Sequence, residues 1–223
     1  MARGPSLQRV STVDALAEAL RHEVLSGAIA PGSQLREVEL ATTYRVGRYS
    51  LRAALQRLAH EGVVRHEPNR GVFVPELSSD DVVDLFLLRE ALETEAVRLL
   101  VHRGTDVDAA GAALAEMEAL EGDEDWDHVT EIDLRFHRSL IDALGSARMS
   151  RVFGAMQAEL RLLLAQLQPH YDRPDKVGAE HRLVFDAITG GDPAAAERRM
   201  REHLEQGVED ILGARERTRS PDP

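Results

Sequence analysis

Three histidines and one aspartate stand at positions where a helical pattern calls for apolar side chains. Asp133 and His137 are four residues apart, about one helical turn, within the apolar stripe of one predicted helix. His181 and His203 interrupt the apolar stripes of two later helices. Burying such groups unpaired costs roughly 1–3 kcal/mol each, so they need partners. A shared divalent metal ion would supply them, and three imidazoles with one carboxylate suit Zn²⁺ first, with Ni²⁺, Mn²⁺ or Fe²⁺ also compatible.

The alternative is that each of these residues is an ordinary core side chain with local hydrogen bonds. An Asp-x-x-x-His pair often arises by chance, and on the residues alone the two interpretations are evenly matched. Arg89 is in line with Leu85 and Leu92 on another predicted helix, so its guanidinium is expected to enter the same cavity. There it would bind a small carboxylate effector, or else form a structural ion pair with Glu93.

A second set of residues has the chemistry to recognise DNA. Arg48 and Arg52 share one face of a predicted helix, and Tyr49 and Ser50 lie in its first turn. An arginine can bond O6 and N7 of guanine together in the major groove, and the first turn of a recognition helix is where such contacts occur. A later turn adds three candidates for backbone or minor-groove contacts, namely Asn69, Arg70 and Gly71. The alternative is a solvated basic surface, which the surrounding order of elements disfavours.

These residues require two different kinds of scaffold. Helices near 12–26, 37–44 and 48–60, followed by two short β-rich runs around Pro68–Gly71, give the order of a winged helix-turn-helix. From Ser78 onward every segment is predicted to be helical: 80–102, 106–121, 126–144, 147–168, 174–189 and 193–213. The fold class is therefore mainly α. We expect a DNA-binding domain over 8–77, an all-α antiparallel helical bundle over 78–215 and a frayed tail over 216–223.

Composition limits the remaining functions. The 223 residues are 43% hydrophobic and 30% charged and contain no cysteine, which excludes disulfides and thiolate catalysis. No apolar run approaches the roughly 18 residues that span a bilayer, so we expect a cytoplasmic protein without a membrane partner. The net charge of −12 divides unevenly, since residues 1–77 carry +2 and residues 78–223 carry −14. Only the mildly basic head therefore suits contact with phosphates.

The head resembles the GntR family of transcriptional regulators over residues 12–75. The motifs that carry the resemblance are Glu37-x-Glu39-Leu40-Ala41, Arg48-x-x-x-Arg52-x-Ala54-Leu55, Glu61-Gly62-Val63-Val64 and Pro68-Asn69-Arg70-Gly71. Gly47 stands where the family usually has Ser or Thr, which removes a helix cap and a phosphate-binding hydroxyl. Arg36 is the nearby residue that could compensate in binding DNA.

The acidic remainder, residues 80–213, resembles the FCD ligand-binding domain of the FadR subfamily. Its motifs are Leu88-Arg89-x-x-Leu92-Glu93, Asp133-x-x-Phe136-His137, Glu180-His181 and Met200-x-x-His203-Leu204. The resemblance implies that Asp133, His137, His181 and His203 hold a divalent metal ion.

The resulting expectation is a metabolite-responsive regulator, most simply a repressor. A C₂ homodimer would bind double-stranded DNA at a palindromic operator, and a small carboxylate metabolite would bind beside the metal ion. One alternative is a metal sensor with no organic effector, and another is a metal ion with a purely structural role. A third is a metal-dependent enzyme fused to a DNA-binding head, but no general base is evident and no catalytic residue is expected.

Overall fold

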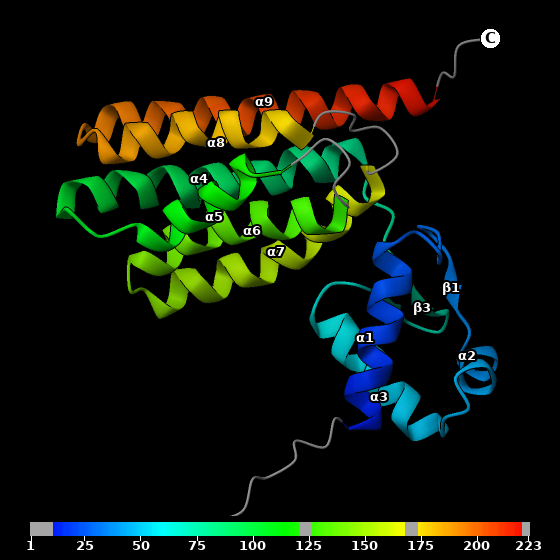
Figure 1. Cartoon of the computed structure of the whole chain (residues 1–223). Helices are drawn as coiled ribbons and strands as arrows, with labels where there is room; N and C mark the ends of the chain where they lie inside the picture. Colours follow the sequence, from blue (N-terminus) through cyan, green and yellow to red (C-terminus); the bar gives the residue numbers. More distant parts are fainter. Residues whose placement is uncertain (1–10, 121–125, 168–173, 220–223) are drawn as a thin grey trace, which may run out of the picture. The chain divides into compact units, whose positions relative to one another are not determined.

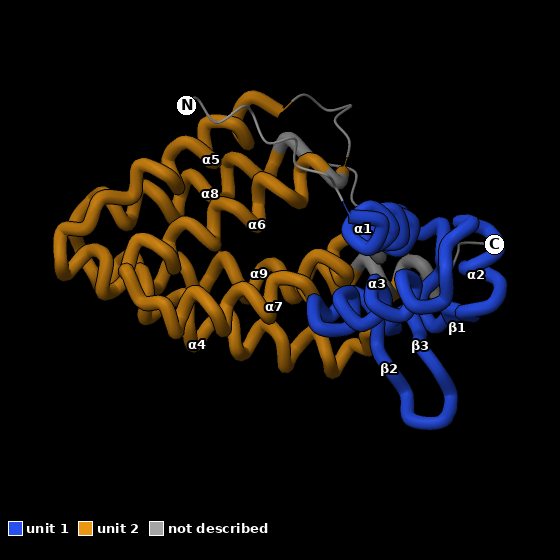
Figure 2. The backbone as a smooth tube through the Cα atoms, turned by 90° about the horizontal axis from the view of Figure 1, so that it is seen from below, with its two compact units in different colours: residues 1–76 blue, residues 77–223 orange. Residues whose placement is uncertain are grey.

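The computed structural model describes residues 11–120, 126–167 and 174–219. The chain divides into two compact units, residues 1–76 and residues 77–223 (Figure 2). This division falls one residue before the predicted boundary. Residues 8–10 of the predicted first domain lie outside the described residues.

The first unit contains three helices and a small sheet. The helices are α1 (Thr12–Leu25), α2 (Glu37–Thr43) and α3 (Arg48–His60), and the strands are β1 (Gln34–Leu35), β2 (Arg65–Glu67) and β3 (Gly71–Phe73). The strand order is β1-β3-β2 with antiparallel pairing, so β2 and β3 form the predicted hairpin. The sequence did not predict β1, which is only two residues long. The predicted winged helix-turn-helix is therefore present, with one strand more than expected.

Local sequence explains where these elements begin and turn. The side chain of Ser11 accepts a hydrogen bond from the backbone N–H of Asp14 and caps α1. Helix α1 packs against α3, and both helices bury apolar side chains there. The turn between β2 and β3 places Asn69 (φ 62°) and Gly71 (φ 109°) in backbone conformations that asparagine and glycine tolerate best.

The second unit is a bundle of helices wherever the structure describes it. The helices are α4 (Ser79–Arg103), α5 (Asp108–Glu118), α6 (Trp126–Ala143), α7 (Ala147–Leu167), α8 (Pro174–Thr189) and α9 (Pro193–Arg219). A capping box between Ser78 and Asp81 begins α4, and Gly104 ends it in the left-handed conformation. None of the described helices is both long enough and apolar enough to cross a membrane.

Two predicted boundaries in this unit were wrong. Helix α5 is shorter than the predicted 106–121: it begins at Asp108, whose backbone N–H donates to the Asp106 carboxylate at 2.7 Å, and it ends at Glu118, while residue 121 lies outside the described residues. Helix α9 continues to Arg219, so residues 216–219 are helical instead of frayed, while 220–223 lie outside the described residues.

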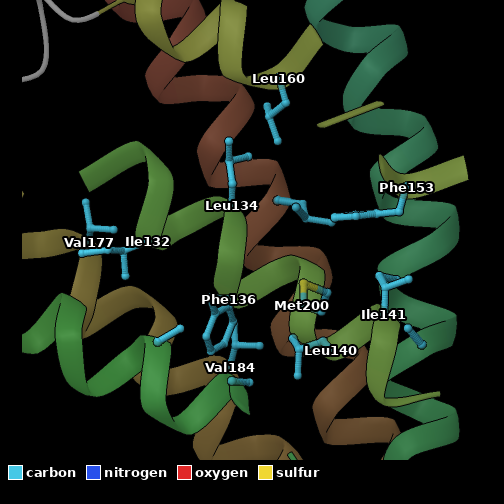
Figure 3. Close-up of a cluster of buried hydrophobic side chains, with 14 of the residues drawn as sticks. Ile132, Leu134, Phe136, Leu140, Ile141, Phe153, Leu160, Val177, Val184 and Met200 are labelled. Carbon is cyan, nitrogen blue, oxygen red and sulfur yellow. The ribbon is translucent and has the colours of Figure 1, made fainter. Parts of the chain in front are cut away.

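Helix α6 contributes the centre of the apolar core. Figure 3 shows Ile132, Phe136 and Leu140 of α6 among side chains of α8 and α9, including Val184 and Met200. The long helices α4 and α9 lie side by side along the bundle (Figure 1). Helices α4, α6, α8 and α9 meet around this core. Polar side chains on the inner faces of these four helices therefore lie close to one another.

Candidate metal centre and nucleic-acid interface

The structure brings together all four residues that the sequence proposed as metal ligands. Asp133 and His137 come from α6, His181 from α8 and His203 from α9. The Nε2 atoms of His137 and His181 are 3.1 Å apart, and those of His137 and His203 are 3.3 Å apart. Oδ1 of Asp133 lies 3.0 Å from Nε2 of His181 and 3.9 Å from Nε2 of His137. Three imidazole nitrogens and one carboxylate oxygen thus converge from three helices.

Hydrogen bonds on the outer side of two rings fix which nitrogen faces the centre. Nδ1 of His181 donates to the carbonyl oxygen of Val177 at 2.7 Å. Nδ1 of His137 donates to Oε2 of Glu93 at 2.5 Å. Since a carbonyl and a carboxylate only accept hydrogen bonds, each Nδ1 carries the proton and each Nε2 of the neutral ring presents a lone pair. Two lone pairs facing each other across 3.1 Å repel unless a cation or proton lies between them.

Electrostatics in this part of the core favour neutral imidazoles and charged carboxylates. Burial lowers the pKa of His137, even though the Glu93 charge opposes that change. Burial also lowers the pKa of His203 well below its ordinary value. For Asp133, burial would raise the pKa, but the contact with Nε2 of His181, in which a cation or a proton lies between the two atoms, outweighs burial and lowers the pKa. The centre therefore combines three lone-pair donors with one negative charge, which is a cation-binding composition.

A cavity of about 80 Å³ adjoins the four residues. Its lining includes the four themselves, Phe86, Arg89, Trp126, Glu180, Leu204, Gly207 and Asp210. A water molecule needs about 10–15 Å³ measured in this way, so the cavity accepts an ion with a molecule of a few heavy atoms but not a long chain.

Arg89 forms the ion pair with Glu93 that the sequence offered as one alternative, and its side chain also reaches the cavity. It is only 4% exposed, lines the cavity, and donates from Nε to Oε1 of Glu93 at 2.7 Å. Its Nη2 is buried and has no hydrogen-bond partner within the part of the chain that the structure describes. Burial would raise the pKa of Glu93, but Arg89 and then His137 outweigh it and hold that pKa at about 2.

Sequence reasoning missed the contact between Glu93 and His137, as well as two carboxylates in the cavity. Glu93 and His137 are 44 residues apart in the chain, so helical spacing could not show their contact. Glu180 and Asp210 also line the cavity, and burial, followed by the nearby Asp210 charge, raises the pKa of Glu180. The two neighbouring carboxyl groups, Glu180 and Asp210, also favour a cation in the cavity.

The predicted DNA-reading side chains lie on the surface of the first unit. Tyr49 is 85% exposed in the first turn of α3, next to the exposed Arg48. Arg52 is also exposed, and its Nε donates to Oε2 of Glu37 on α2 at 2.7 Å. This ion pair, which the sequence did not predict, links Arg52 to the preceding helix.

The remaining candidates of this surface surround α3. Ser50 is half-buried in the first turn of α3, and Gly47 precedes the helix without a side-chain cap, as expected. Arg36 is exposed and pairs with Glu39. In the turn between β2 and β3, Arg70 is exposed and pairs with Glu67. Asn69 and Gly71 shape this turn through their positive φ angles.

Comparison with known proteins decides what these two units are. Residues 12–74 match the family described as bacterial regulatory proteins, gntR family, and residues 84–206 match the FCD domain. The chain belongs to the GntR family of transcriptional regulators. As a GntR-family protein it is a DNA-binding regulator and not an enzyme, which removes the enzyme alternative.

Relatives of this GntR-family regulator are similar to it in sequence or structure over most of its length. An HTH-type transcriptional regulator in an unstable DNA locus of Streptomyces ambofaciens is 32% identical, over 92% of this chain and 85% of that protein. A protein of Paenarthrobacter nicotinovorans, assigned as the transcriptional repressor of a D-xylose utilization operon, is 28% identical over 89% and 88% of the two chains. A crystal structure from Rhodococcus sp. RHA1, assigned as a GntR transcriptional regulator, superimposes with a TM-score of 0.75 at 27% identity, over 91% and 98% of the two chains.

Proposed function

We propose that this GntR-family regulator is a repressor whose helical unit binds a divalent metal ion together with a small carboxylate effector. One observation carries the proposal. Lone pairs of buried imidazoles and one carboxylate converge beside a cavity that also receives an unpaired guanidinium nitrogen of Arg89. A cation would bind the imidazole lone pairs and the carboxylate, and an anion would accept a hydrogen bond from the guanidinium nitrogen.

The distances support a metal ion held by Asp133, His137, His181 and His203. Nitrogens that share an ion at about 2.1 Å lie about 3.0–3.4 Å apart for angles between octahedral and tetrahedral. The two measured Nε2–Nε2 distances, 3.1 and 3.3 Å, fall within this range. Zn²⁺ suits this donor set best, and Ni²⁺, Mn²⁺ and Fe²⁺ are also compatible. When bound, the ion would supply a positive charge with open positions for a ligand oxygen.

The same cavity supports a carboxylate as effector. The planar guanidinium group is the side chain best matched to a carboxylate, and Nη2 of Arg89 is a buried donor on the cavity wall without a partner among the described residues. The ring of Phe86 lies 4.8 Å from the guanidinium carbon of Arg89 and holds it in place from one side. With about 80 Å³ available, the effector is limited to a few heavy atoms.

Operator recognition requires two copies, and α4 with α7 offers a surface for a second copy. Leu87 is 63% exposed and Leu88 is 42% exposed on α4, and Val152 is 48% exposed on α7; a contiguous exposed apolar patch, unlike a single exposed residue, marks a contact surface. Leu87 and Leu88 line one groove with Glu159 of α7. We call these residues, with the charged ones described next, the α4/α7 face.

Charge on the α4/α7 face is self-complementary. Helices α4 and α7 run in opposite directions (Figure 1). Asp80 and Asp84 near the start of α4 therefore share one end of the face with Glu159, whereas Arg148 and Arg151 at the start of α7 occupy the other end. A two-fold axis through the apolar middle would place the acidic end of each copy on the basic end of the other. We therefore propose a C₂ homodimer that presents two α3 helices to a palindromic operator.

The experiment compares operator binding in three states of one protein. DNA bound by the protein is selected from a random pool, and its affinity is then measured with chelator-treated protein, with Zn²⁺-loaded protein, and with Zn²⁺-loaded protein plus a panel of small carboxylates. Affinity that changes only in the third state supports the proposal. Affinity that follows Zn²⁺ alone indicates a metal sensor without an organic effector.

Matched variants test whether the change in operator affinity depends on the four proposed metal ligands. His181→Ala is expected to lose Zn²⁺ and the response, while His128→Ala, which removes an exposed histidine of α6, is expected to keep both. Arg89→Ala is expected to weaken the carboxylate more than Zn²⁺. A wild-type content of Zn²⁺ in His181→Ala protein would reject the ligand set.

A further inference from the structure

The buried carboxylate of Glu93 lies between the two binding groups of the cavity. Glu93 is 2% exposed, and its two oxygens bind different partners. Oε1 accepts from Nε of Arg89 on its own helix at 2.7 Å, while Oε2 accepts from Nδ1 of His137 on α6 at 2.5 Å. One carboxylate thus joins the arginine that faces the effector space to a histidine of the metal centre.

The Arg89–Glu93 pair uses Nε alone, as Arg138–Asp142 and Arg201–Glu90 do, whereas two exposed pairs of the same bundle are two-pronged. Arg98 donates from both Nε and Nη2 to the two oxygens of Glu95, each at 2.7 Å. Arg182 likewise binds both oxygens of Glu118, at 2.8 and 2.5 Å. Arg89 donates to Glu93 through Nε alone, and the second oxygen of Glu93 accepts from His137 instead. A pair that served only to neutralise a buried charge would gain from the two-pronged arrangement.

We infer that Glu93 is a positioning residue that couples the carboxylate effector to the metal ion. The inference rests on the proposed function. By accepting from Nδ1, Glu93 keeps Nε2 of His137 turned toward Asp133, His181 and His203. By leaving Nη2 unpaired, it keeps one donor of Arg89 available for a ligand.

The sign of this coupling follows from how hydrogen bonds polarise one another. A carboxylate ligand on Arg89 draws the guanidinium charge away from Glu93, which then accepts more strongly from His137 and makes its Nε2 a better donor to a cation. A cation bound to Nε2 of His137 makes Nδ1 a stronger donor to Glu93. Glu93 then binds Arg89 less tightly, which leaves Arg89 freer to bind the carboxylate ligand. Effector and metal ion therefore strengthen each other's binding, by an equal factor in both directions.

Glu93→Gln separates this positioning role from a merely structural one. The substitution is expected to lower the affinity for Zn²⁺ and to raise the affinity for acetate. Its Zn²⁺ affinity, measured by calorimetry, is expected to fall by about 10- to 100-fold, the usual effect of losing a carboxylate behind a histidine ligand. Its affinity for acetate without metal is expected to rise, since Arg89 is left with an uncompensated buried charge. The fluorescence of Trp126, the single tryptophan of the chain and part of the cavity lining, reports acetate binding. A simply damaged site would lose both ligands.

Two further variants keep the test decisive. Glu95→Gln makes the same change on the same helix in an exposed pair, and both affinities should stay at the wild-type level. If Glu93→Gln does not fold, Arg89→Gln/Glu93→Gln removes both buried charges together. It should bind Zn²⁺ about 10- to 100-fold more weakly than Arg89→Gln alone.

The outcomes distinguish this inference from the proposed function. Wild-type protein that binds neither Zn²⁺ nor acetate contradicts the proposed function itself. Wild-type protein that binds both, with Glu93→Gln unchanged in Zn²⁺ affinity or weakened in both affinities, overturns the role of Glu93 alone. Equal Zn²⁺ affinity of the double variant and Arg89→Gln overturns it as well.

Discussion

Replacing Gly207 with alanine should stabilise the helical unit and weaken effector binding at the same time. Gly207 lies inside α9 and lines the cavity. A Cβ at this position would lie 3.1 Å from Cε1 of Phe86, whose ring lines the same cavity. The ring must move by a few tenths of an ångström, and the cavity gives it space to do so. The glycine therefore keeps open a volume that alanine would take from the ligand.

Both effects can be given a magnitude. Alanine inside a helix is about 0.5–1 kcal/mol more favourable than glycine. Since 1 kcal/mol shifts the Tm of a protein of this size by about 2–4 °C, we expect a rise of about 1–4 °C without effector. The cavity of about 80 Å³ leaves little volume to spare. Losing ligand contact equivalent to one methylene costs about 0.8 kcal/mol, or about fourfold in affinity.

Gly111 provides a matched control for this test. It lies inside α5, and a Cβ there would lie 3.1 Å from Cζ of Phe185, the same kind of contact, but neither residue lines the cavity. Tm is measured by thermal unfolding, and acetate affinity of Zn²⁺-loaded protein by the fluorescence of Trp126. Gly111→Ala should raise Tm without changing acetate affinity. A lower Tm for Gly207→Ala, or acetate binding equal to wild type, would refute the reasoning.

Three other predictions concern DNA, metal and assembly. Arg48→Ala should abolish selective binding to the selected operator in a mobility-shift assay while circular dichroism stays unchanged; retained selectivity would show that α3 reads DNA through other residues. Removing Zn²⁺ that was present at 100 times its Kd should lower Tm by about 5–11 °C, from about 2.7 kcal/mol of linked stability, and an unchanged Tm would contradict metal binding. Leu87→Glu should yield monomers in analytical ultracentrifugation. Leu183→Glu, the same change at another exposed leucine, on α8, should not, and a dimeric Leu87→Glu protein would exclude the α4/α7 face.

Local pattern was enough to predict most helices, and it singled out the four polar residues on the inner faces of α6, α8 and α9. Asp133 and His137 occupy an apolar stripe, so the sequence itself requires that they be buried and find partners. The structure places them with His181 and His203, as predicted. The exposed first turn of α3 was likewise predicted from the spacing of Arg48 and Arg52.

Boundaries and pairings set by distant residues were predicted less well. Strand β1 has only two residues and forms because β3 offers it partners, so no local pattern marks it. The ion pair between Arg52 and Glu37 joins two helices and depends on the angle between them. The length of α9 was underestimated because the polar residues 215–219 continue the helix without the apolar stripe that would identify it.

The sequence by itself determined which side chains must lie inside the bundle, because helical periodicity assigns each residue a face. Only the tertiary structure decided what those side chains do for one another. Glu93 could pair with Arg89 on spacing alone, but packing of α4 against α6 gives its second oxygen to His137 and leaves a guanidinium nitrogen unpaired. Such a contact depends on the distance between two helices, which no periodicity within either helix contains.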